Sequence, residues 1–136
     1  MAEPKTKGWL FYGPCGTSRR DIIAWWESRR LRFNLWVGVT GFVTWWLVLI
    51  AGGASVKPGV DFEEPLAMTL GPIAYAILAN VFYTSGWILD VVTSADGPRK
   101  TLFKIGLIFS VVLTALPGLW AVAAFLITLY TGRKLD

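Results

Sequence analysis

The residues best suited to chemistry inside an apolar segment of this chain lie between positions 80 and 90. Their polar and aromatic side chains recur at spacings of three and four, which at about 100° per residue places them within one arc of about 120° on a helix. In a membrane such a face turns toward protein or a water-filled cavity, because unsatisfied polar groups are costly in lipid. The pattern predicts either a helix-packing seam or a path for a substrate or ion. The residues of this polar face are Asn80, Tyr83, Thr84, Trp87 and Asp90.

Acid–base chemistry has few candidate groups in this sequence. The chain has no histidine, which is the commonest general base and metal ligand. A base would have to be Asp90 or Glu27, and no nucleophile is paired with either. Local pairing with nearby arginines accounts for Glu27, and Arg29, Arg32 or Lys104 could pair with Asp90. We therefore expect a non-enzymatic protein with no catalytic residue, no metal site and no cofactor.

The elements that carry these residues are predicted by the distribution of charge. Charged residues make up only 16% of the chain, against about 25% in ordinary globular proteins. None occurs in 35–56, 65–87 or 105–132. Each of these stretches can supply the ~20 apolar residues that a helix needs to cross the hydrocarbon core. The sequence predicts an all-α membrane protein with a transmembrane domain at 33–136 and three spans at about 33–53, 65–92 and 103–130.

Prolines and glycines predict the ends and bends of the spans. Pro65 follows two glutamates and suits the first position of a helix. Pro72 and Pro117 lie inside the second and third spans, where each removes a backbone donor, so we expect bends there. A re-entrant hairpin at Pro117 is the alternative for the third span, although each half would have only about a dozen residues, too few to cross.

The first 32 residues form the predicted cytoplasmic N-terminal segment. Ser18 and Asp21 match a capping box, which predicts a helix from about residue 19 to 32. We expect this helix to lie at the membrane interface, with tryptophans settling among the headgroups and arginines reaching toward them. A docking surface for a protein partner or anionic lipid is the alternative. The interfacial anchors are Trp25, Trp26, Arg29, Arg30 and Arg32.

The basic residues also predict the orientation of the chain. With the N-terminus inside, Lys57, Arg133 and Lys134 lie outside and the other ten of the 13 lysines and arginines lie inside. This bias favours a cytoplasmic N-terminus and an external C-terminus. Because the basic residues flank the apolar spans, their positions also argue against a nucleic-acid partner.

The third span carries a ladder of small residues. Gly106, Ser110, Thr114 and Gly118 are spaced four apart, so they share one helix face. Small residues at this spacing let another helix approach closely, and hydroxyls can bond across the contact. The ladder predicts a packing seam within the bundle or between copies of the chain.

Three stretches of the sequence carry a resemblance to a known group of proteins. They are Trp-Trp-Glu-Ser-Arg-Arg-Leu-Arg-Phe-Asn at 25–34, Ala-Asn-Val-Phe-Tyr-Thr-Ser-Gly-Trp-Ile-Leu-Asp at 79–90, and the segment 106–118. They resemble motifs of a group of uncharacterised small bacterial multi-pass membrane proteins, although Phe33 replaces a tyrosine and Asp90 a glutamate. The resemblance implies a protein of the bacterial inner (cytoplasmic) membrane and implies no activity.

Two functions remain open at this point. We expect an accessory subunit or scaffold that acts in the lipid bilayer through helix–helix association, with a homo-oligomer or a larger membrane protein as its partner. The alternative is a small oligomeric transporter or channel that uses the Asn80–Asp90 face. Three helices alone are too few to enclose a convincing path.

Overall fold

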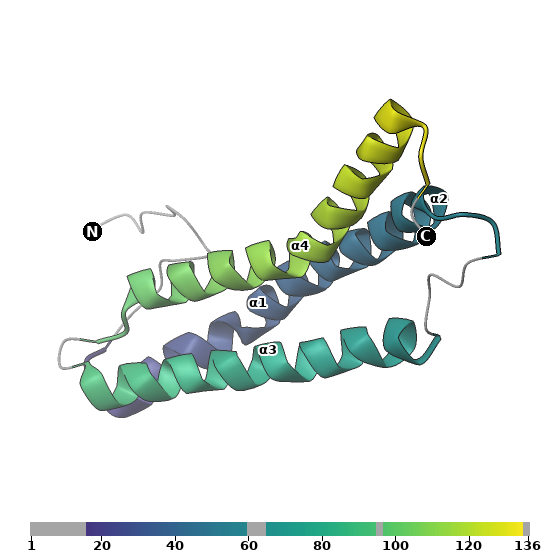
Figure 1. Cartoon of the computed structure of the whole chain (residues 1–136). Helices are drawn as coiled ribbons and strands as arrows, with labels where there is room; N and C mark the ends of the chain where they lie inside the picture. The colour runs from purple at the N-terminus through teal and green to yellow at the C-terminus, as the bar shows by residue number, and fades with distance from the viewer. Residues whose placement is uncertain (1–15, 60–64, 95–96, 135–136) are drawn as a thin grey trace, which may run out of the picture.

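The computed structural model describes residues 16–59, 65–94 and 97–134, and this part of the chain is helical without any strand. The helices are α1 (Arg19–Leu47), a π-helical turn η1 (Val48–Gly52), the short α2 (Gly53–Ser55), α3 (Pro65–Thr93) and α4 (Lys100–Thr131) (Figure 1). Within the described residues, three helical segments are long and apolar enough to cross a membrane. The predicted all-α fold with three membrane-spanning helices is therefore confirmed.

The first helical segment differs from the prediction. Arg19–Ser55 is continuous over 37 residues, which at 1.5 Å per residue is about 55 Å, against a hydrocarbon core of about 30 Å. A separate interfacial helix ending at Arg32 is therefore wrong, because the N-terminal helix runs directly into the first span. The physical reason is local: between Arg19 and Val37 the chain has no glycine or proline that could break the helix.

The two ends of this long segment follow from identifiable side chains. The predicted capping box is present: the Ser18 hydroxyl accepts from the Asp21 N–H (3.2 Å), and the Asp21 carboxylate accepts from the Ser18 N–H (3.3 Å). At the other end the helix widens into η1 and continues to Ser55, two residues beyond the predicted end of the first span. The Ser55 hydroxyl then donates to the Ala51 carbonyl at 2.6 Å.

The second and third spans lie close to their predicted positions. α3 begins at Pro65, as expected, and α4 begins three residues earlier than expected. α4 ends before Gly132, whose φ of 67° is the left-handed conformation of a helix C-cap. α4 is one continuous helix, which excludes a hairpin at Pro117. Figure 1 shows α4 changing direction near its middle, where Pro117 lies, whereas no comparable bend of α3 is visible in this view.

All three long helices pack together at only one end, whereas toward the other end α4 packs on η1 and α2, with Ala51, Ser55 and Ala121 buried there. The end where all three meet, here called the Arg19 end, holds the start of α1, the end of α3 and the start of α4 (Figure 1). The main cluster of buried apolar side chains lies there, and within the spans' most apolar windows only 17%, 11% and 22% of residues are buried. The apolar surface left exposed needs lipid as its solvent, so the chain is a multi-pass membrane protein.

Candidate functional site

The carboxylate of Asp90 joins all three long helices. Its side chain is 0% exposed and lies near the end of α3. The indole N–H of Trp26, on α1, donates to Oδ2 at 2.8 Å, and the backbone N–H of Arg99, which caps α4, donates to the same oxygen at 2.9 Å. The Ser94 hydroxyl donates to Oδ1 at 2.5 Å. These four residues are called the Asp90 junction below.

Among the described residues, Arg99 forms the ion pair with Asp90. Its Nε lies 3.6 Å from Oδ1 and donates to the Ser94 hydroxyl at 3.0 Å, while its Nη2 donates to the Thr93 hydroxyl at 2.6 Å. The ion pair thus joins the end of α3 to the N-cap of α4, and is not made with Arg29, Arg32 or Lys104, which were the predicted partners. A buried carboxylate with a charge partner and three hydrogen bonds has its desolvation offset, which is how a structural ion pair persists.

An aromatic cluster surrounds the Trp26 side of the junction. The Trp26 ring makes edge-to-face contacts with Phe103 (5.6 Å between centroids) and Tyr83 (5.3 Å), and Trp25 contacts Phe103 at 5.7 Å. The Tyr83 hydroxyl donates to the Trp26 carbonyl at 2.5 Å. Phe33 stacks obliquely on Tyr83 at 4.7 Å. Trp26 is therefore held by its ring, its carbonyl and its indole N–H.

The predicted interfacial anchors are mostly inside the protein. Trp25 and Trp26 are each 3% exposed and Arg29 is 4% exposed, so these three do not face the headgroups as expected. The cause is that α3 and α4 pack on this stretch of α1, which continues as one helix into the membrane. The Arg29 guanidinium lies 3.9 Å from the centroid of the Trp25 ring and donates to the Trp25 carbonyl at 2.9 Å.

The other two predicted anchors remain partly accessible. Arg30 binds Glu27 through two hydrogen bonds of 2.9 and 2.7 Å, as the local pairing of Glu27 predicts. Its Nη2 also donates to the Thr84 hydroxyl on α3 at 3.3 Å. Arg32 is half-buried.

The polar face of α3 turns toward α1. Asn80 and Asn34 exchange amide hydrogen bonds of 2.9 and 3.2 Å, while Thr84, Tyr83 and Asp90 make the bonds to α1 described above. The indole nitrogen of Trp87 is buried and has no hydrogen-bond partner among the described residues. The face is therefore a seam between two helices of one chain.

The residues of α1 that meet this face were not predicted to do so, because two of them were assigned to the membrane interface as anchors. They are Trp26, Arg30 and Asn34, which are spaced four apart and so share one face of the helix. They meet the antiparallel α3 in order, with Asn34 opposite Asn80 and Trp26 opposite Asp90. This regular spacing, matched against that of the α3 face, is the sequence signal that could have found them.

The small-residue ladder of α4 is used over part of its length. A Cβ added at Gly118 would lie 3.2 Å from the Cα of Thr44, so α4 and α1 approach closely there. The Thr114 hydroxyl lies 2.8 Å from the Tyr75 hydroxyl, which donates to the Ser110 carbonyl at 3.2 Å. Gly106 has open space around it and is exposed, so it takes no part in the seam inside this chain.

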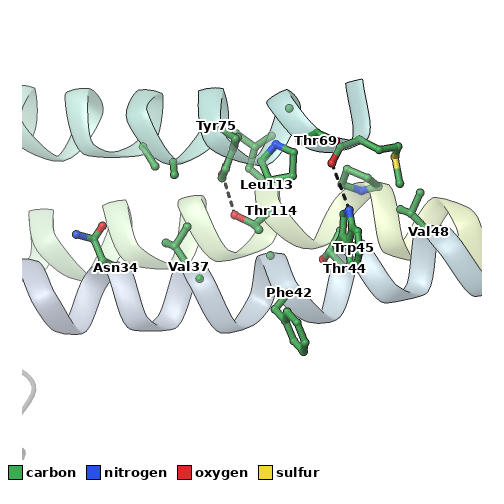
Figure 2. A pocket seen from close by; sticks show the side chains of 18 of the residues that line it. Asn34, Val37, Phe42, Thr44, Trp45, Val48, Thr69, Tyr75, Leu113 and Thr114 are labelled. Carbon is green, nitrogen blue, oxygen red and sulfur yellow. Dashed lines mark hydrogen bonds between the residues drawn. The ribbon is translucent and has the colours of Figure 1, made fainter. Parts of the chain in front are cut away.

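A groove of about 870 Å³ lies within the spans, between α1 and α3, with part of α4 beside it. Figure 2 shows Val37 and Tyr75 pointing into it, Trp45 reaching toward α3 and Phe42 pointing away. Its volume falls in the range of ligand-binding pockets, about 300–1,000 Å³. No charged residue lines it.

Among the described residues, no group of three or more histidine, cysteine, aspartate or glutamate side chains lies close enough to hold a metal ion. Asp90 is already bonded to donors from three elements, so its carboxylate is positioned for structure. What the arrangement offers chemically is an apolar groove beside a rigid polar junction.

Comparison with protein families, curated proteins and solved structures gives no match to this chain. The resemblance to small bacterial membrane proteins in the motifs at 25–34, 79–90 and 106–118 therefore stays a prediction.

Proposed function

We propose that this chain is a non-enzymatic accessory subunit or scaffold of the bacterial inner membrane that acts through helix–helix association. The observation that carries the proposal is that polar side chains are bonded inside the bundle, whereas its outer surface is apolar. The polar side chains of the α3 face are bonded within the bundle, while large apolar side chains are exposed on all three spans. Outside the helices, the described residues form only short connections, so a partner would meet helix surfaces within the bilayer.

The proposed orientation has the Arg19 end in the cytoplasm. Among the described residues, Lys57, Arg133 and Lys134 lie at the opposite end, and the other basic residues lie at or near the Arg19 end. This asymmetry supports a cytoplasmic N-terminus. Reporter fusions to both termini test it: we expect activity of a cytoplasmic reporter at the N-terminus and of a periplasmic reporter at the C-terminus.

The alternative, an oligomeric transporter or channel along Asn80–Asp90, has less support. A conduction path needs polar groups that can exchange partners with a passing solute. Asn80 and Asp90 instead bond to Asn34 and Trp26 of the same chain. Solute or ion flux into liposomes that contain the purified protein would favour the alternative.

Photo-crosslinking in native membranes tests the association proposal. A photoreactive residue is placed at one exposed position on each span: Val39 (53% exposed), Ile77 (62%) and Leu119 (60%). We expect at least one position to give a discrete product heavier than the 15.1 kDa chain, and this product should disappear after dilution into detergent before irradiation. Lipid adducts alone at all three positions would refute association.

A further inference from the structure

Two contacts between α1 and α3 lie near the two ends of the groove between these helices. At the Arg19 end the contact is the amide pair of Asn34 and Asn80, and at the other end the indole N–H of Trp45 donates to the Met68 carbonyl at 3.4 Å (Figure 2). At 1.5 Å per residue, these contacts are about 16 Å apart along α1 and about 18 Å apart along α3. One leaflet of a hydrocarbon core of about 30 Å measures about 15 Å. The groove therefore has the length of one lipid chain within one leaflet.

The shape of the groove suits a slender occupant. Its volume of 870 Å³ is spread over a length of about 17 Å. The groove is also continuous with the exterior, because Gly38 and Ala76 line it and are themselves exposed. A slender occupant can enter sideways from the bilayer.

The polar atoms beside the groove also favour an apolar occupant. The side-chain amides of Asn34 and Asn80 bond each other, and the hydroxyls of Tyr75 and Thr114 are bonded within the bundle. An occupant thus meets polar side chains that are mostly bonded already, and it is bound by apolar contact along the rest of the wall.

A basic residue lies one helical turn beyond the Asn34–Asn80 pair, toward the Arg19 end. Arg30 lies four residues from Asn34, and Thr84, which Arg30 contacts, lies four residues from Asn80. The Nε and Nη2 of Arg30 serve Glu27 and Thr84, while its Nη1 donates to no described residue. The side chain is 31% exposed, so it can reach an anionic headgroup at the membrane surface.

We propose that this groove is a binding site for one acyl chain of an anionic phospholipid in the leaflet at the Arg19 end, with the lipid phosphate beside Arg30. The Asn34–Asn80 pair marks the depth at which the apolar groove ends. The inference is independent of the association proposal, because it concerns a lipid held by a single chain.

The test uses the full chain in vesicles of phosphatidylethanolamine and phosphatidylglycerol that contain a phosphatidylglycerol probe with a diazirine in its acyl chain. After irradiation, mass spectrometry of peptides locates the adducts. We expect them to concentrate in 34–48 and 67–80. Gly38→Leu and Ala76→Leu, which fill the groove from opposite walls, should each remove them. Gly106→Leu, at an equally open glycine outside the groove, should keep them.

A second comparison tests the headgroup. Arg30→Gln should lower labelling by the phosphatidylglycerol probe about fivefold relative to a phosphatidylethanolamine probe, the effect of one arginine near an anionic surface. Lys104→Gln removes a charge at the same end, away from the groove, and should leave that ratio unchanged. Adducts spread evenly over all exposed helix positions and insensitive to the groove variants would overturn the proposal. A photoreactive residue in the groove that crosslinks to a second copy of the chain, with a product that Gly38→Leu abolishes, would also overturn the proposal, because a protein would then occupy the groove.

Discussion

Replacing Asp90 tests whether the Asp90 junction holds the three helices together. Asp90→Ala removes the acceptor of the Trp26 indole N–H, the Ser94 hydroxyl and the Arg99 backbone N–H, and it leaves these donors in a site that is 0% exposed. The Arg99 side chain is 48% exposed and stays hydrated, so the cost comes from the buried donors that lose their acceptor. Each such donor costs about 1–3 kcal/mol, or about 2–6 kcal/mol for the Trp26 indole and the Arg99 backbone N–H together. We therefore expect the free energy of unfolding to fall by about that amount.

Asp90→Asn removes the negative charge at this position but keeps the size of the side chain and an acceptor oxygen. The amide oxygen can still accept from Trp26 and Arg99, and the Ser94 hydroxyl can turn to accept from the amide NH₂. What is lost is charge assistance, since hydrogen bonds to charged groups are worth about 1.5–3 kcal/mol and neutral ones about 0.5–1.5. For two such bonds we expect a loss of about 2–3 kcal/mol, smaller than that of the alanine variant.

The assay is equilibrium unfolding by SDS in mixed detergent micelles, followed by far-UV circular dichroism and tryptophan fluorescence. Glu27→Gln is the matched control, because Glu27 is also a carboxylate paired with arginine at the Arg19 end, but its side chain is 43% exposed. Such an exposed pair contributes about 0.2–1 kcal/mol. The reasoning is refuted if both Asp90 variants unfold like the control, or if asparagine costs as much as alanine.

Three further variants test the other contacts by the same unfolding assay. Asn34→Leu leaves the Asn80 amide without its partner and should cost about 0.6–1.7 kcal/mol, and adding Asn80→Leu should recover most of this loss if the amide pair is the cause. Gly118→Val forces side-chain atoms against the α1 backbone and should cost about 1–3 kcal/mol, whereas Gly106→Val meets open space and should be neutral; equal effects would contradict the close approach. Tyr83→Phe keeps the ring contacts but loses the bond to the Trp26 carbonyl, so a loss of about 1 kcal/mol is expected, and no measurable change would remove this bond from the account.

The three spans could be predicted because their signal is local. A long stretch without charge is recognisable in the sequence whatever surrounds it, and Pro65 and Gly132 mark helix ends by their own backbone preferences. The predicted helix boundary at Arg32 was wrong because it was placed where the sequence changes from polar to apolar. A change of solvent does not break a helix when the residues on both sides are compatible with it.

The contacts at the Arg19 end could not be predicted in the same way. Tryptophans at a membrane interface and tryptophans in a protein core have the same sequence pattern, and only the packing of α3 and α4 distinguishes them for Trp25 and Trp26. The partner of Asp90 was missed for a related reason. Charges on other helices were considered, whereas Arg99 reaches it across the turn that joins α3 to α4.

The position of the Asp90 junction explains how a bundle this open can be stable. Apolar contacts between helices gain little within lipid, because lipid chains are as apolar as the side chains they replace. Asp90 lies six residues beyond Thr84, or about 9 Å further toward the Arg19 end, past the charge-free part of α1. Burial of aromatic rings gains more there, where water reaches the protein. The Asp90 junction and its aromatic cluster can therefore hold the three helices together at this end. α1 and α3 then need not pack tightly within the membrane, so a groove between them is compatible with a stable fold.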